Sequence, residues 1–169
     1  MDEQLLNQCL KNYFVKLSEE PTLTSDDINN RTERKRFYQS YSGDRITGLS
    51  EDDFFEYLSK LWAMQFWNNK KYKVEKIIGD NGFQTIKDKL QYLLYGEDPV
   101  NNRWDDFNRS IKGFGSSMMS ELLCYVHPND CMVWNSTAAK AYRNLGISVP
   151  RHDYQVTGDK YLVCYRYKG

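Results

Sequence analysis

The sequence predicts a single all-α domain over residues 1–169. Its length, with 40% hydrophobic and 27% charged residues, is ordinary for one globular domain. Apolar residues recur three and four positions apart through most of the chain, as they do in helices with one buried face. Residues that favour helix ends flank these segments, and a strand-like composition is confined to the last part of the chain.

Two helices are expected before the first glycine pair. Apolar residues from Leu5 to Leu17 have helical spacing and Pro21 follows them, which indicates a helix with one buried face. A second helix is expected over about residues 25–40, because residues 24–27 supply capping and acidic side chains at its start. Gly43 and Gly48 then bracket an expected loop.

The strongest helical pattern begins at Ser50, where Ser50 and Asp53 have the spacing of a capping box. The apolar side of this helix is expected in the core, and we expect the rings of Trp62 and Trp67 there rather than on a stacking surface. This side comprises Phe54, Leu58, Leu61, Trp62 and Gln65, widened by Phe55 and Phe66.

Two more helices are expected over residues 72–78 and 83–95, with Gly96 as a cap at the end of the second. After Pro150 the composition changes, and residues 161–165 are rich in strand formers. That last segment is expected to be either a lone strand or an extended tail.

Composition excludes several classes of protein. The four cysteines are scattered and the two histidines lie far apart, so zinc and iron–sulfur sites lack their ligand spacing and we expect no metal or other cofactor. The acidic start and the lack of a long apolar run predict a soluble cytoplasmic protein without a membrane segment. Net charge is zero overall, but residues 1–29 are acidic and residues 134–169 are basic.

The most informative segment is Gly113-Phe114-Gly115, which lies between two short amphipathic segments. Two glycines around one apolar residue allow a sharp turn that comes close to a ligand, while Phe114 is expected to anchor the turn in the core. The following helix would present unpaired amides at its start. Together with Lys112, these amides would suit one phosphate of a nucleic-acid backbone.

This segment resembles the helix-hairpin-helix motif, and residues 104–146 resemble that region of the helix-hairpin-helix DNA glycosylase superfamily. In that superfamily a catalytic Asp opens the helix after the hairpin, and a Leu-Gly pair ends it. Counting back from Leu145 and Gly146 puts Asn135 at the Asp position. The resemblance implies a helical glycosylase-like domain that binds duplex DNA, mostly through its phosphates.

The catalytic groups of the superfamily are missing. Ser117 stands where the bifunctional branch has a lysine nucleophile, and Asn135 cannot accept a proton as an Asp can. The resemblance therefore implies a non-catalytic module that targets DNA in a restriction or repair context, with a nuclease or nucleotide-hydrolysing domain as partner. Its expected DNA-binding residues are Lys112, Gly113, Phe114, Gly115, Ser116 and Ser117, and Trp134 with Asn135 would form a pocket that senses a modified or flipped base.

Other interpretations remain open. Asn135 could simply cap its helix, and the basic runs at residues 34–36 and 70–76 could be solvated faces. An active monofunctional glycosylase would need another carboxylate, for which Asp130 is the nearest candidate in the sequence. A protein-interaction domain is the second alternative, because the overall charge is zero.

Overall fold

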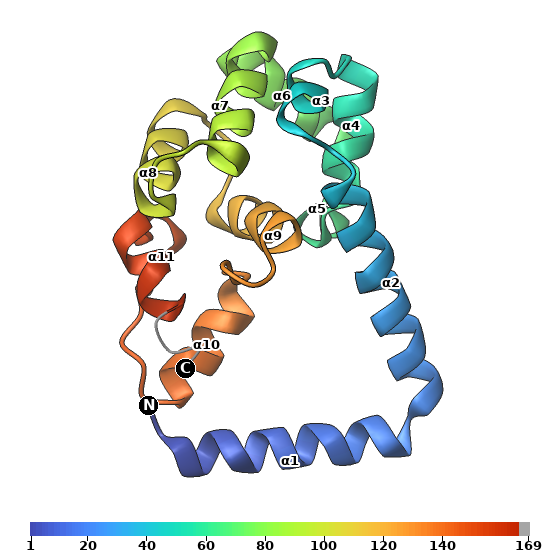
Figure 1. The fold of residues 1–169 in the computed structure, drawn as a ribbon, viewed down its shortest axis with the longest axis vertical. Coiled ribbons are helices and arrows are strands. Elements are labelled where there is room, and N and C mark those ends of the chain that lie inside the picture. The colour runs from blue at the N-terminus through green and yellow to red at the C-terminus, as the bar shows by residue number, and fades with distance from the viewer. Residues whose placement is uncertain (166–169) are drawn as a thin grey trace.

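The computed structural model describes residues 1–165, apart from the side chains of residues 21–24, 153 and 163–165, and within that range it contains helices and no strand (Figure 1). This confirms the all-α prediction. The helices are α1 (Glu3–Glu19), α2 (Pro21–Gln39), α3 (Gly43–Thr47), α4 (Glu51–Ser59), α5 (Trp62–Gln65), α6 (Lys70–Asn81), α7 (Phe83–Tyr95), α8 (Val100–Ser110), α9 (Ser116–Val126), α10 (Ser136–Asn144) and α11 (Gly158–Tyr165), with the 3-10 turn η1 (Asp153–Gln155).

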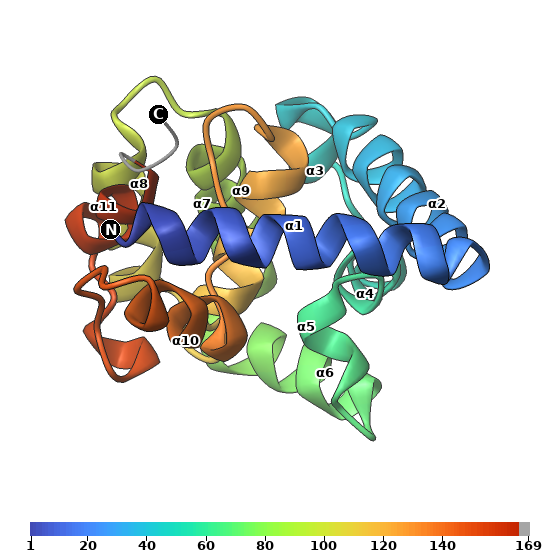
Figure 2. The same cartoon turned by 90° about the horizontal axis from the view of Figure 1, so that it is seen from below.

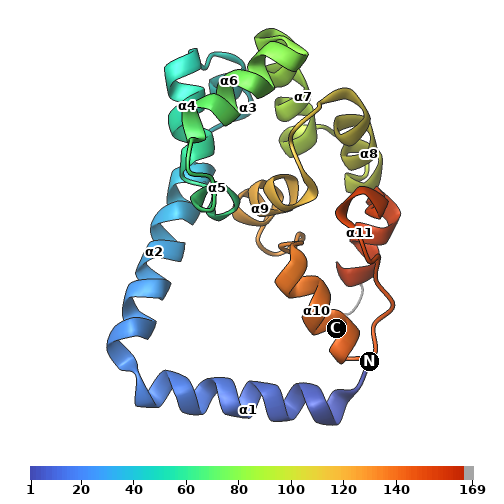
Figure 3. The ribbon, with the colours of Figure 1, turned by 180° about the vertical axis from the view of Figure 1, so that it is seen from behind.

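Helices α1 and α2 lie along two edges of the molecule (Figure 3), and in the view from below α1 runs across the molecule from the N-terminus to α2 (Figure 2). The buried face predicted for the first helix is wrong, because no residue of α1 is buried. The start of the chain is instead attached through its backbone, where the amide of Asp2 donates to the carbonyl of Leu145 over 2.8 Å. The second predicted helix is present as α2, although it begins earlier than expected.

The core lies around α7 and α9, which supply many of its buried apolar residues. The predicted helix over residues 83–95 is observed with these bounds, and the amide of Gly96 donates to the Tyr92 carbonyl at its end. The expected loop after Gly43 is the short helix α3, which packs against α7. Core residues from these and neighbouring helices include Ile46, Phe54, Leu58, Ile86, Leu90, Leu93, Leu94, Trp104, Phe107, Met119, Leu122 and Leu123.

The predicted strand or extended tail over residues 161–165 is also wrong, because these residues belong to α11. Its first amide, that of Gly158, donates to the Asp105 carboxylate over 2.7 Å. The ring of Tyr161 stacks on Trp104, with ring centres 4.3 Å apart and planes 14° from parallel. Strand formers therefore adopt a helix here because burial against α8 stabilises it, whereas a lone strand would leave its backbone groups unpaired.

Candidate functional site

The Gly-Phe-Gly segment forms the connection between α8 and α9. Gly113 has a φ of +79°, which side chains other than glycine rarely adopt, and this lets the chain reverse before α9. Phe114 is 2% exposed and its ring meets that of Phe107 edge to face at 5.1 Å, so it anchors the connection in the core as expected. We call residues 111–115 the hairpin.

Asn81, the last residue of α6, connects this helix to the hairpin through hydrogen bonds. The side chain of Asn81 accepts a hydrogen bond from the Lys112 amide over 2.7 Å and donates one to the Lys112 carbonyl over 3.0 Å. The side-chain NH₂ group of Asn81 also donates a hydrogen bond to the Ile77 carbonyl over 2.7 Å. With its backbone groups paired in this way, the Lys112 side chain remains exposed to solvent.

The start of α9 presents unpaired backbone donors beside the hairpin. Gly115 occupies the N-cap position and supplies no side chain to the helix start. The amides of Met118 and Met119 donate to the Gly115 carbonyl, but those of Ser116 and Ser117 find no acceptor among the groups that the structure describes. Such amides, at the positive end of a helix dipole, favour an anion.

A surface hollow of about 600 Å³ lies over this helix start. On one side it is lined by the hairpin and the first residues of α9, and on the other by residues of the α5–α6 region. None of the described residues that line it is acidic. They are Ala63, Trp67, Lys73, Asn108, Ile111, Lys112, Gly113, Phe114, Gly115, Ser117 and Met118.

The Lys73 ammonium is the second positive charge at this hollow. Its Nζ lies 4.5 Å from the centre of the Trp67 ring and 3.8 Å from the position that a Cβ at Gly113 would occupy. Burial and the nearby Lys76 lower the pKa of Lys73, because both disfavour its charged form. An anion placed beside Lys73 would favour that form.

The rest of the basic run on α6 pairs locally instead. Lys71 and Lys76 form ion pairs one turn along the helix with Glu75 at 3.9 Å and Asp80 at 3.0 Å. Lys70 donates to the side chain of Gln65. Of this run, only Lys73 is among the described residues that line the hollow.

Trp134 and Asn135 do not lie among the described residues that line the hollow. Trp134 is 1% exposed, and its backbone is paired with the Ser120 hydroxyl. The Asn135 side chain accepts from the Ala138 amide over 2.8 Å, which confirms the capping interpretation. The base pocket stays a prediction that requires the Trp134 ring to become accessible.

Two tryptophans that the sequence predicts in the core are instead at the surface. Trp62 is 50% exposed and Trp67 is 47% exposed. The polar run at residues 68–71 that follows Trp67 directly is the one local signal that could have indicated this. Trp67 is therefore a residue of the candidate site that sequence reasoning missed.

No family model, curated protein or solved structure matches this chain.

The buried carboxylate on the helix after the hairpin has a structural role. Glu121 on α9 is buried, and its two oxygens accept from the amides of Trp62 over 2.5 Å and Ala63 over 2.9 Å, so it caps α5. Burial raises the pKa of Glu121, and these hydrogen bonds oppose that shift. Asp130, the alternative catalytic candidate, is exposed and does not line the hollow.

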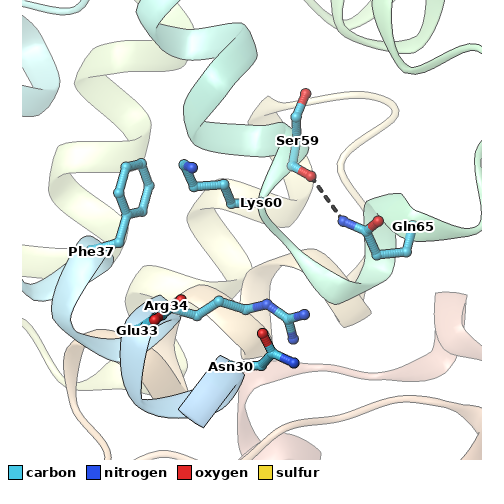
Figure 4. A pocket seen from close by; sticks show the side chains of 7 residues that line it. All are labelled: Asn30, Glu33, Arg34, Phe37, Ser59, Lys60 and Gln65. Carbon is cyan, nitrogen blue, oxygen red and sulfur yellow. Dashed lines mark hydrogen bonds between the residues drawn. The ribbon is translucent and has the colours of Figure 1, made fainter. Parts of the chain in front are cut away.

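A second, smaller hollow of about 290 Å³ lies between α2 and the α4–α5 region (Figure 4). The cations that line it already have partners. Lys60 pairs with Glu56 at 3.4 Å, and Arg34 lies over the Trp62 ring at 5.3 Å and hydrogen-bonds Tyr125. Arg34 thus belongs to this hollow, and not to the one at the hairpin.

Within residues 1–165, no three potential ligands from His, Cys, Asp and Glu come together among the side chains that the structure describes. None of the helices described there combines the length and the apolar character that crossing a bilayer requires.

Proposed function

We propose that this protein is a DNA-binding module of the helix-hairpin-helix type, which holds the phosphate backbone of duplex DNA at the hairpin. The contacts come from Lys112, Gly113, Phe114, Gly115, Ser116 and Ser117. The observation that carries the proposal is the pair of unpaired amides of Ser116 and Ser117 at the start of α9, next to a hollow that Lys73 and Lys112 line together with no described acidic residue.

The two glycines allow a clean test of this proposal. A Cβ at Gly115 would meet nothing within 4 Å and the φ of −77° suits any residue, so Gly115→Ala should fold normally. Its methyl group would nevertheless occupy space beside the Ser116 and Ser117 amides. We expect Gly115→Ala to weaken binding of a labelled duplex, measured by fluorescence anisotropy, with an unchanged circular dichroism spectrum.

Lys112→Ala tests the charge. Loss of one phosphate contact should weaken binding equally for different sequences and reduce the slope of log affinity against log salt by about one. Lys11→Ala is the matched control, because Lys11 is an exposed lysine on α1. Wild-type affinity in both Gly115→Ala and Lys112→Ala would contradict the proposal.

We propose targeting without base excision. With Ser117 and Asn135 at the two catalytic positions implied by the resemblance, duplexes with uracil, alkylated or oxidised bases should be bound without release of a base. Base release that disappears in Asp130→Asn would instead establish the glycosylase alternative. For the non-catalytic module that we propose, a nuclease or nucleotide-hydrolysing partner would supply the reaction on the targeted DNA.

A protein-interaction role is the second candidate, and the exposed apolar side chains of α1 favour it. Leu10, Tyr13, Phe14 and Val15 are all exposed on this helix. If α1 binds a protein, Phe14→Ser should weaken that association and leave duplex binding at the hairpin unchanged. A wild-type protein that binds no DNA at any salt concentration would favour this role over the first.

A further inference from the structure

Trp67 offers a ring face next to the hairpin. About half of its surface is exposed, it follows the short helix α5, and it lines the same hollow as Lys112 and Ser117. An aromatic ring that is accessible beside a positively charged groove is the arrangement on which single-stranded nucleic acids stack their bases.

The helix that precedes Trp67 is fixed relative to the hairpin. Glu121 lies in α9, the helix that follows the hairpin, and it accepts hydrogen bonds from the first amides of α5. A buried, doubly hydrogen-bonded carboxylate therefore connects the two walls of the hollow. This connection holds Trp67 and the hairpin at a set separation before any ligand arrives, which reduces the entropy lost on binding.

The charges in the hollow suit a nucleotide. Nζ of Lys73 lies over one face of the Trp67 ring, 4.5 Å from its centre, and Lys112 lies on the hairpin, so both cations line the hollow together with the ring. A base can stack on this face when the Lys73 ammonium moves to the phosphate. A phosphate that enters the hollow would place a negative charge beside Lys73, and this attraction would offset the repulsion between Lys73 and Lys76. The volume of about 600 Å³ falls within the range of pockets that hold a small ligand.

We propose that this hollow binds one unpaired nucleotide of DNA, with its base stacked on Trp67 and its phosphate between Lys73 and Lys112. The proposal rests on the proposed function, since the hairpin supplies the adjoining phosphate contacts. Within a duplex both faces of a base are covered by its neighbours, so the Trp67 ring can stack only on a base that has left the helix or extends beyond its end. Of these two cases we propose the second, so the substrate class is duplex DNA with a single-stranded extension.

Fluorescence anisotropy with three probes tests this inference: a blunt duplex, the same duplex with a short oligothymidine tail on its 5′ end, and the same duplex with that tail on its 3′ end. We expect the wild-type protein to bind one of the tailed duplexes more tightly than the blunt one. Trp67→Ala should lose that preference, about tenfold for one stacked base, and keep its affinity for the blunt duplex. Trp67→Phe keeps an aromatic face and should retain most of the preference.

Trp62→Ala is the matched control, because Trp62, at the start of α5, is about as exposed as Trp67 but is not among the described residues that line the hollow. It should leave the preference intact. Equal wild-type affinity for tailed and blunt duplexes, or a preference that survives in Trp67→Ala, would overturn the inference and leave the proposed function standing. Absence of binding to every probe would overturn both.

Discussion

The side-chain amide of Asn81 forms two hydrogen bonds with the backbone of Lys112, one to its amide and one to its carbonyl. The two residues are 31 positions apart, and this contact connects the end of α6 to the hairpin. The basic side chain of Lys112 can therefore extend into solvent from a fixed backbone.

Asn81→Ala should lower both stability and DNA affinity. Two neutral hydrogen bonds to Lys112 are lost, which predicts a decrease of about 1–3 kcal/mol in the free energy of unfolding, measured by urea denaturation. Asn81→Asp keeps the acceptor for the Lys112 amide but loses both donated hydrogen bonds and adds a negative charge beside the hairpin, so its DNA affinity should be no higher than that of Asn81→Ala. Wild-type affinity in a folded Asn81→Ala protein would show that the hairpin needs no support from α6.

The two hairpin glycines should differ in their effect on folding. Gly113→Ala places a side chain at a φ of +79° with Ile77 at 3.4 Å, so we expect a loss of about 1 kcal/mol or more and a lower Tm. Gly115→Ala should leave the Tm near that of the wild type, because its backbone is extended and the space beside it is open. Equal destabilisation by both substitutions would contradict the backbone geometry described for the hairpin.

Glu121→Gln should destabilise the protein at neutral pH by about 1–3 kcal/mol, because the glutamine NH₂ would face a backbone N–H donor. Burial raises the folded-state pKa of Glu121, so between the unfolded and folded pKa values the folded state binds more protons. Wild-type stability relative to Glu121→Gln should therefore increase as the pH falls through the folded pKa toward the unfolded value of about 4.3.

Urea denaturation of the wild type and Glu121→Gln at matched pH values would measure this difference, and groups common to both proteins largely cancel. A difference that shrinks on acidification would mean that the hydrogen bonds from Trp62 and Ala63 outweigh burial and lower the pKa instead.

Gly158→Ala should disrupt the contact between α11 and α8. A Cβ at Gly158 would lie 2.1 Å from the carbonyl oxygen of Asn101, so the helix start would have to move, and we expect a loss of about 2 kcal/mol or more. Gly79→Ala is the matched control in the interior of α6, where a Cβ meets nothing within 4 Å. It should raise the Tm slightly through its better helix propensity, whereas a Tm for Gly158→Ala near the wild-type value would contradict the close approach.

Local patterns predicted the parts of the fold that local interactions decide. The helix over residues 83–95 has regular apolar spacing and a glycine directly after it, so its bounds could be read from the sequence. The capping box at Ser50 and Asp53 is likewise a contact between near neighbours, and it is present. The same holds for the Asn135 cap and for the burial of Phe114.

Contacts between distant segments decided the rest. Residues 161–165 have strand-forming side chains, but the stacking of Tyr161 on Trp104 makes this segment helical. The spacing of apolar residues in α1 indicates a helix, yet it does not reveal that none of the residues of this helix is buried in the described structure. Trp67 could be placed at the hairpin only once the contact between Glu121 and α5 was known.

Helix α1 contributes no side chain to the core, and the first core residue along the described part of the chain is Tyr38. Natural selection for a stable fold therefore constrains residues 3–19 weakly, whereas it constrains Phe114 and Asn81 through their contacts. Sequence drift should accordingly be fastest along the surface of α1.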